Sequence, residues 1–285
     1  MSKLKWLWDK LPVIVRGIIV GMIVQILGVM PIFWLLMANV QRLNEVPWAF
    51  FVGLIYLWVF WSYIKGKGWP NSTSKVRSKY VRFNTMDAKL RTWSIISGFL
   101  FTLTLAGMII WSWLLVSWPT AQAELLQTFV ASPKWTIIPL LALGALSTGI
   151  VEESAYRGYM QVPIENRHGP AVGIGVVAVV FALSHPLPPT IVPFFIVGSL
   201  GWGVLAYLAN STLPGMIFHT LIDLSFYVWG LYNVESLGNM QSFSVLENGV
   251  TSFFLYAVIF SVIFGAATVV SFYRLAKMKK VGSGQ

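Results

Sequence analysis

Apolar runs close to 20 residues long recur along this 285-residue chain and constrain its fold more than any other feature. A bilayer hydrocarbon core of ~30 Å needs about 20 helical residues to cross it. Eight such runs can be placed, at about residues 13–37, 47–64, 93–118, 135 onward, 170–186, 190–209, 213–232 and 250–273. The sequence predicts an all-α fold, a polytopic membrane helix bundle with about eight transmembrane helices, in which residues 1–285 form a single integral membrane domain.

Composition supports this assignment and removes several kinds of site. The 14 Trp and 10 Tyr suit the two bilayer interfaces. Cysteine is absent, which excludes a thiol nucleophile, a thiolate metal site and disulfides. The net charge of +10 fits basic cytoplasmic loops better than a nucleic-acid partner, so none is expected. The first apolar run is too long for a signal peptide, and we expect an uncleaved first span.

The distribution of Lys and Arg predicts the orientation. The segment 65–92 carries eight of them against a single acid, Asp87, and therefore reads as a basic cytoplasmic loop. The N-terminus and the tail at 274–280 are basic as well, whereas Glu235 and Glu247 lie in a loop without Lys or Arg. We expect both termini in the cytoplasm and an integral protein of a bacterial plasma membrane. The basic loop is expected to be solvated, although its interleaved aromatic residues would also suit anionic lipid.

Six ionisable residues fall inside the late spans: Glu152, Glu153, Arg157, His185, His219 and Asp223. Ionisable residues are costly in lipid and usually face a bundle interior or a watery cavity. Each also has a purely structural interpretation. A lone histidine can hydrogen-bond a neighbouring helix, and a Glu four residues before an Arg can form a helix-surface pair.

Helix spacing separates the two glutamates. Glu153 and Arg157 are four residues apart and share a helix face, whereas Glu152 is rotated by about 100° from Glu153. This predicts that Arg157 neutralises Glu153 and leaves Glu152 for catalysis, unless Arg157 reaches both. His219 and Asp223 also share a face. Asp223 could orient His219, share a ligand with it, or donate to a substrate oxygen when protonated.

The depth of these residues depends on where the fourth helix ends. If it continues to about Asn166, with a kink possible at Pro163, the turn centres near His168. Glu152 then lies about 16 residues before the turn and His185 about 17 after it, so both are roughly 24–26 Å from its tip. His219 can reach the same level. The sequence thus predicts one site in the cytoplasmic half of the bilayer.

Several chemistries are excluded by the sequence. It has no His-Glu-x-x-His motif, no serine nucleophile elbow and only one Asp within a span. A glutamate with two histidines remains. Glutamate can activate water directly, with His and Asp donors stabilising the oxyanion. Alternatively, Glu152, His185 and His219 can hold a Zn²⁺ whose bound water attacks. Both alternatives lead to peptide hydrolysis.

Three motifs on successive late helices carry a resemblance: Glu152-Glu153-x-x-x-Arg157, Phe181-x-x-x-His185 and His219-x-x-x-Asp223. Together they resemble the CPBP intramembrane proteases, which include CAAX prenyl endopeptidases and bacteriocin-processing or self-immunity proteins of the Abi type. The motif region covers roughly residues 135–233.

The resemblance implies roles for these residues. Glu152 would activate water with His185, His219 and Asp223 would serve the oxyanion or a metal, and Arg157 would support the glutamates. Glu153 and Phe181 complete the implied site. The family often has Asn where this chain has Asp223, and an Asp there donates a hydrogen bond only when protonated.

The predicted function is an intramembrane endopeptidase that cleaves a membrane-associated protein or peptide, in CAAX-type or leader-type processing. The alternative is a non-catalytic membrane protein, such as an immunity factor, a pseudo-enzyme or a small transporter, that uses the same polar site for binding. The expected partners are the bilayer and a peptide or protein substrate.

Overall fold

The computed structural model describes residues 3–115, 129, 131–185, 190–233 and 245–282. Within these ranges the secondary structure is helical, with an isolated bridge between Phe83 and Ser211 and no strand. The long helical elements are α2 (Val13–Arg42), α3 (Trp48–Ile64), α5 (Ala88–Leu115), α7 (Lys134–Glu152), α9 (Pro170–Leu183), α10 (Val192–Ala209), α11 (Leu213–Tyr232) and α14 (Ser252–Gly282). The shorter ones are α1 (Lys3–Lys10), η1 (Asn71–Thr73), α4 (Ser74–Tyr80), η2 (Glu153–Met160), α8 (Gln161–His168) and α13 (Val245–Asn248).

The predicted all-α membrane bundle is confirmed. Five helical stretches are long and apolar enough to cross a membrane, α3 and α9 are shorter apolar helices, and α11 occupies the seventh predicted position, about 213–232. Large apolar side chains face outward, including Trp34 at 65% exposure and Ile55 at 66%, as expected for a lipid-facing surface. Residues 116–118 and 186, at the ends of two predicted spans, lie outside the described residues.

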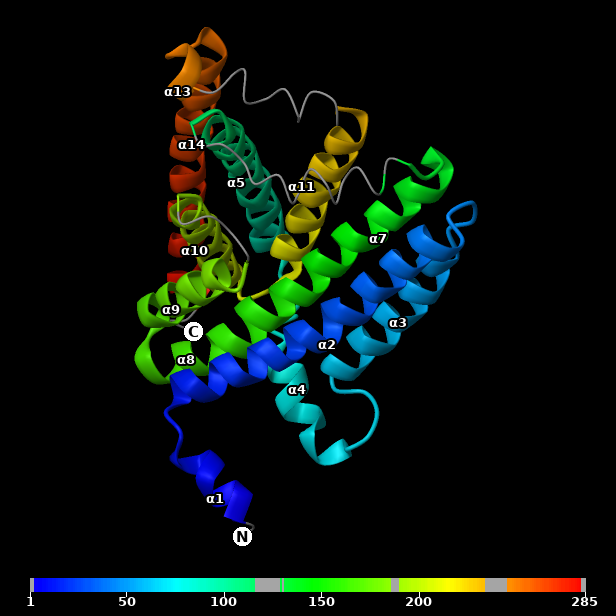
Figure 1. The fold of residues 1–285 in the computed structure, drawn as a ribbon. Coiled ribbons are helices and arrows are strands. Elements are labelled where there is room, and N and C mark those ends of the chain that lie inside the picture. Colours follow the sequence, from blue (N-terminus) through cyan, green and yellow to red (C-terminus); the bar gives the residue numbers. More distant parts are fainter. Residues whose placement is uncertain (1–2, 116–128, 130, 186–189, 234–244, 283–285) are drawn as a thin grey trace.

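The helices form two groups that α11 joins. In Figure 1, α2 and α3 run beside α7, α5 packs along α14, and α11 contacts both α7 and α5. Gly28 of α2 approaches Val151, and Gly149 of α7 approaches Met216 and Thr220 of α11. Small residues permit this close packing of helix backbones in lipid. The two groups therefore meet at α7, one turn before the paired glutamates.

The fourth span runs well beyond the glutamates, as the sequence predicts. α7 continues through the π-helix η2 into α8, so that one helical stretch of 35 residues runs from Lys134 to His168. Pro163 contributes no N–H and its ring crowds the carbonyl of Tyr159, which favours widening of the preceding turns. The departure from α-geometry is thus a π segment rather than a kink at Pro163. Gly169 then adopts a φ of 87° and Pro170 starts α9.

The segment 65–87 is folded against the bundle instead of being solvated throughout. Arg77 is 6% exposed and donates to the carbonyls of Lys67 and Gly68, both at 3.0 Å. Arg82 forms a 2.6 Å ion pair with Glu165 of α8. The expectation of a solvated loop is wrong for these two arginines, because carbonyls of the segment itself accept from Arg77 and Glu165 of α8 pairs with Arg82. Other basic side chains of the 65–87 segment are exposed, including Lys67, Lys75 and Lys79.

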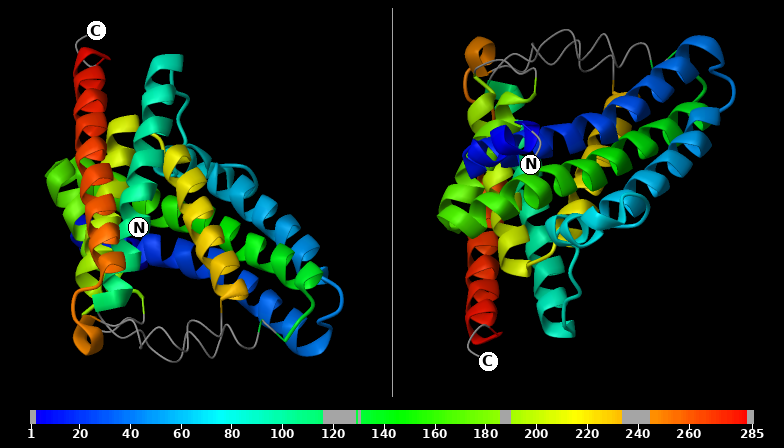
Figure 2. Two further views of the ribbon diagram at one scale, coloured as in Figure 1. Left: turned by 90° about the horizontal axis from the view of Figure 1, so that it is seen from above. Right: turned by 90° about the horizontal axis from the view of Figure 1, so that it is seen from below.

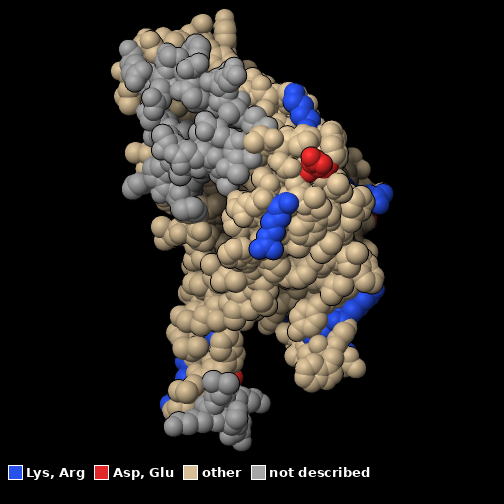
Figure 3. All heavy atoms as spheres, turned by 45° about the vertical axis from the view of Figure 1, so that its right-hand side comes forward, with Lys and Arg blue, Asp and Glu red and all other residues tan. Residues whose placement is uncertain are grey.

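Basic residues are concentrated at one end of the bundle. α2 lies antiparallel to the α7–α8 stretch, since Gly17 meets Ile164 and Gly28 meets Val151. Arg42, at the end of α2, and Lys134, at the start of α7, therefore lie at the other end of the bundle from the contact between Gly17 and Ile164. Figure 2 shows the end of α14 near the start of α5, where Arg274 lies 4.7 Å from the Trp93 ring. Over the described part of the face in Figure 3, most of the surface is neither basic nor acidic.

The α7–α11 contact can be tested with two Gly→Ala substitutions. A Cβ at Gly149 would lie 2.1 Å from the Thr220 hydroxyl oxygen, whereas a Cβ at Gly175 of α9 meets no atom within 4 Å. Gly149→Ala should lower the free energy of unfolding by about 1–3 kcal/mol through overpacking. Gly175→Ala should be neutral or slightly stabilising. Thermal unfolding of the purified variants in detergent measures both, and equal melting temperatures would contradict the assigned packing.

Candidate active site

The two adjacent glutamates lie inside the bundle, where α7 changes into η2. Glu152 is 6% exposed and Glu153 is fully buried. The Gln25 amide, from the middle of α2, donates to Glu152 Oε1 at 3.1 Å. Gln25 stands 12 residues into α2, about 18 Å from its start. Glu152 is therefore well inside the span and away from both surfaces, as the long-helix interpretation requires.

Glu153 is held by groups from two elements, η2 and α11. Its Oε1 lies 3.2 Å from Arg157 Nη1, the expected ion pair, and 3.0 Å from His219 Nδ1. Arg157 also donates to Ser199 of α10 at 3.0 Å. Gly215 leaves room for this carboxylate, because a Cβ there would lie 2.5 Å from Glu153 Oε2. Glu153 thus both neutralises Arg157 and orients His219, a second role that the sequence interpretation lacked.

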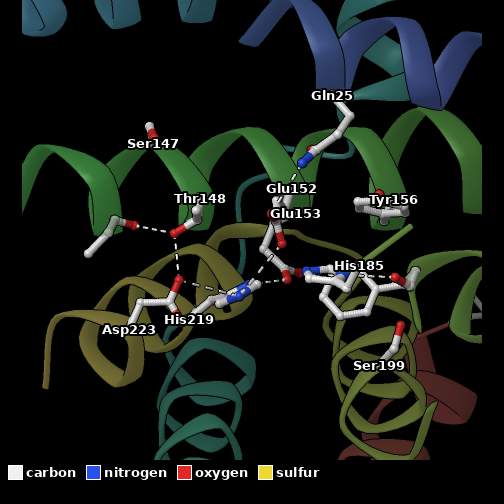
Figure 4. Close-up of polar contacts among 12 residues, drawn as sticks. Gln25, Ser147, Thr148, Glu152, Glu153, Tyr156, His185, Ser199, His219 and Asp223 are labelled. Atoms are coloured by element: carbon white, nitrogen blue, oxygen red, sulfur yellow. Dashed lines mark hydrogen bonds and ion pairs between the residues drawn. The ribbon is translucent and has the colours of Figure 1, made fainter. Parts of the chain in front are cut away.

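His219 is the centre of the cluster (Figure 4). Because a carboxylate only accepts, the hydrogen bond to Glu153 places a proton on His219 Nδ1. His219 Nε2 lies 3.8 Å from Glu152 Oε2 and 3.8 Å from Asp223 Oδ2. The Trp202 ring is nearly parallel to the imidazole, at 9°, with 6.1 Å between centroids. The Nε2 edge of the imidazole therefore faces the carboxylates of Glu152 and Asp223, while the Nδ1 edge is held by Glu153.

Asp223 lies one helical turn beyond His219 and contacts α7 through Thr148. The Thr148 hydroxyl is 2.5 Å from Asp223 Oδ2 and 2.9 Å from the Ala145 carbonyl. A hydroxyl has one proton and can donate to only one of them. If that proton goes to Ala145, Asp223 must carry a proton and donate to Thr148. The arrangement thus admits the protonated Asp223 that the sequence left as one alternative.

His185 lies just past the end of α9 and shares a cavity with Glu152. Its Nδ1 is 2.7 Å from the Phe181 carbonyl, which can only accept, so Nδ1 carries the proton and Nε2 is left as an acceptor. The cavity, about 250 Å³, is lined by Glu152, His185, Gln25 and apolar residues of α2. The level placement of Glu152 and His185 is thus reproduced. Within the described contacts no hydrogen bond joins them directly.

Phe181 packs against three side chains of the site. Its ring lies 4.5 Å from the His185 ring and 5.0 Å from the Tyr156 ring, and the Arg157 guanidinium lies 4.6 Å from its centroid. Tyr156 in turn contacts the Ser184 hydroxyl at 2.7 Å. Phe181 therefore supports Arg157 and His185 together, which explains why an aromatic residue stands four positions before that histidine.

Four partners were missed by the sequence interpretation: Gln25, Thr148, Ser199 and Trp202. Gln25 had a readable signal, because it is the one amide within an otherwise apolar stretch of the first span. Thr148 had a weaker one, since it stands four residues before Glu152. Ser199 and Trp202 had none, because small hydroxyls and Trp are common in membrane helices for unrelated reasons.

The ligand set suggested for Zn²⁺ does not converge. Over the described residues, no three side chains of His, Asp or Glu are arranged to hold a metal ion. His185 Nδ1 is engaged by a backbone carbonyl. The donors nearest to His219 Nε2 are two carboxylates that lie on different helices. The arrangement fits hydrogen bonding better than coordination, and no chemical step is assigned to a metal.

Comparison with known proteins agrees with the resemblance. Residues 133–225 match the family described as type II CAAX prenyl endopeptidase Rce1-like. This segment contains all three motifs and therefore all seven site residues predicted from the sequence. Searches of curated proteins and of solved structures gave no match. The matched family confirms the CPBP-type resemblance over the part of the chain that forms the site.

Removing the arginine should expose the cost of the buried carboxylate. Arg157→Gln leaves Glu153 fully buried without its cation, which should lower the free energy of unfolding by about 3–5 kcal/mol. The double variant Glu153→Gln/Arg157→Gln should recover part of that loss, because no unpaired charge remains. Thermal unfolding of the single and double variants tests this. A double variant less stable than Arg157→Gln would contradict the assigned ion pair.

Proposed function

We propose that this protein is an intramembrane endopeptidase that hydrolyses a peptide bond of a membrane-associated protein or peptide, with water activated by Glu152. One observation carries the proposal. Glu152 is a buried carboxylate at the wall of a partly open cavity between α2, η2 and the end of α9, and His219 Nε2 lies 3.8 Å from its Oε2. The match of the surrounding segment to a membrane endopeptidase family supports the same reaction class.

The cavity can supply the water that hydrolysis requires. At about 250 Å³ it has room for several water molecules, and it offers polar groups from Glu152, His185, Gln25 and Ser184. Gln25 engages Glu152 Oε1, which leaves Oε2 for a water. The His185 tautomer presents an accepting Nε2. A water held between Glu152 and His185 would therefore be polarised by two acceptors.

The proposed reaction balances within these residues. Glu152 takes a proton from water as the oxygen attacks the peptide carbonyl carbon, forming a tetrahedral oxyanion. Imidazolium at His219 donates a hydrogen bond to that oxyanion through Nε2. Protonated Asp223 donates a second one when the Thr148 hydroxyl donates to Asp223 Oδ2 instead of to the Ala145 carbonyl. Glu152 then delivers its proton to the leaving amine nitrogen as the C–N bond breaks. The immediate products are a carboxylic acid and an amine, and Glu152 is regenerated; the acid then gives its proton to the amine, leaving a carboxylate and an ammonium group.

The partners of the cluster hold these groups in place. Glu153 orients the His219 ring through Nδ1, and Arg157 balances the charge of Glu153 from the same helix face. Both are positioning residues because they are fully buried and bonded to other protein groups: Glu153 to Arg157 and His219, and Arg157 to Glu153 and Ser199. This division keeps the glutamate that handles protons separate from the one that fixes the imidazole.

The charge distribution supports an orientation, and the family resemblance supports a substrate class. The basic end of the bundle would face the cytoplasm, with both termini there, because Lys and Arg accumulate on that side of membrane proteins. The substrate would be a membrane-associated chain, either a CAAX-type tail or a leader-type segment. Residues 65–92 would form the basic cytoplasmic region and residues 135–233 the catalytic region of one membrane domain.

Replacing Glu152 should remove activity without unfolding the protein. Glu152→Gln keeps an amide beside Gln25 but loses the general base, so cleavage should fall at least about 100-fold. Glu45→Gln, at an exposed position after α2, is the matched control and should be unchanged. Quantitative proteomics of membrane and secreted peptides from cells expressing each protein at equal levels measures the difference.

The outcomes separate the alternatives. Unchanged cleavage products with Glu152→Gln would refute the proposed role. A phenotype that survives the substitution while no product forms in the wild type would favour a non-catalytic binding protein, and substrate-dependent flux would favour a transporter. Repeating the assay with a chelator and measuring the metal content of the pure protein tests the Zn²⁺ alternative independently.

The proposed donor role of Asp223 predicts opposite results for two substitutions. Asn at this position can donate to the Thr148 hydroxyl, which is free to bond Ala145, so Asp223→Asn should retain most activity. Asp223→Ala lacks any donor and should reduce kcat by about 10- to 1000-fold. An Asn variant as inactive as the Ala variant would show that the carboxylate charge is required instead.

A further inference from the structure

A second cavity, larger than the first, lies at the basic end of the bundle. Its volume is about 320 Å³ and its walls come from α1, the first turns of α2, the end of α4, the end of η2 and α8. No residue lines both cavities. The second cavity therefore needs an explanation of its own, apart from the proposed hydrolysis.

Two arginines from antiparallel helices line this cavity. Arg16 stands in the first turn of α2 and Arg167 in the last turn of α8. No acidic side chain is among the lining residues, and over the described part of the chain neither arginine forms an ion pair. By contrast, the buried Arg82 and Arg157 each face a glutamate. The cavity thus combines two positive charges with no negative one.

The helix ends strengthen this positive field at one side. Arg16 sits at the N-terminus of α2, where the helix dipole disfavours a cation and favours an anion. No acid occupies that first turn and Pro12 provides no side-chain cap. Arg167 lies in the last turn of α8, where the helix dipole favours a cation, so the charge without a compensating partner is chiefly that of Arg16. An anion between them would be stabilised by both guanidinium groups and by the α2 terminus.

The position of the cavity points to a lipid rather than a free anion. It lies where the apolar span of α2 begins, which is the level of lipid headgroups. α1 projects from this end (Figure 1) and exposes Trp6 at 47%, Leu7 at 50% and Trp8 at 36%. Exposed Trp beside Lys is typical of a helix that lies in the membrane interface. Trp8 also lines the cavity.

We propose that this cavity binds the phosphate headgroup of an anionic membrane lipid, with Arg16 and Arg167 as the phosphate ligands. Basic pockets between transmembrane helices on the cytoplasmic side suit such headgroups. Asn166, whose amide is a neutral donor, and Tyr80 and Tyr159 also line the cavity. Tyr159 itself is already committed through its hydroxyl to the Ile64 carbonyl at 2.9 Å.

The test measures lipid binding in the absence of any peptide. Full-length protein carrying Glu152→Gln is placed in nanodiscs of phosphatidylcholine containing phosphatidylglycerol, and the retained lipids are quantified by native mass spectrometry. We expect a preference for phosphatidylglycerol that falls about fivefold for each arginine replaced by Gln, and about 25-fold in the Arg16→Gln/Arg167→Gln variant. Because the catalytic base is absent, the result is independent of the proposed protease activity.

Matched variants make the outcome decisive. Arg42→Gln removes the same charge from the exposed far end of α2 and should leave the preference unchanged. Arg16→Lys/Arg167→Lys should keep most of it, since the charges remain. If the double Gln variant is not monodisperse, Arg167→Gln decides alone, because this side chain is exposed and its loss should not unfold the protein. An undiminished preference, or displacement of the lipid by inorganic phosphate, would overturn the proposal.

Discussion

The buried carboxylate of Glu153 is the constraint on which the rest of the site depends. A fully buried charge is tolerated only when it is paired, and here the pairing draws on Arg157 from the same helix and His219 from α11. Arg157 extends the network to Ser199 of α10. Three helical elements are therefore fixed relative to one another by a single charge. The position of His219, and through it the distances to Glu152 and Asp223, follow from that requirement.

Much of the fold follows from hydropathy along the chain, because a span through lipid is specified by a run of local sequence. The eight predicted spans each correspond to a helix, and the continuation of the fourth span to His168 follows from the helical pattern beyond Glu152. The depth of Glu152 and His185 could then be obtained from the rise per residue alone. These features depend on neighbours in sequence and require no knowledge of lateral packing.

Other features depend on lateral packing and were therefore not predictable from one sequence. Which face of α2 meets Glu152 is decided by the glycine contacts with α7, and only that decision gives Gln25 its role. The burial of Arg82 depends on Glu165 of α8, 83 positions away, so it has no local signal. Arg77, by contrast, is bound by carbonyls of its own segment. The second bond of Glu153, to His219, likewise joins residues 66 positions apart.

The wall that α2 gives to the Glu152 cavity has a consequence for how the working unit is delimited. The recognisable family segment begins at residue 133, yet Met22, Gln25 and Val29 of the first span close one side of the proposed active site. The segment that matches the family is thus shorter than the part of the chain that forms the proposed active site. A fragment cut to the recognisable segment, or a chimera that exchanges the first span, would keep every motif residue while leaving Glu152 open to lipid.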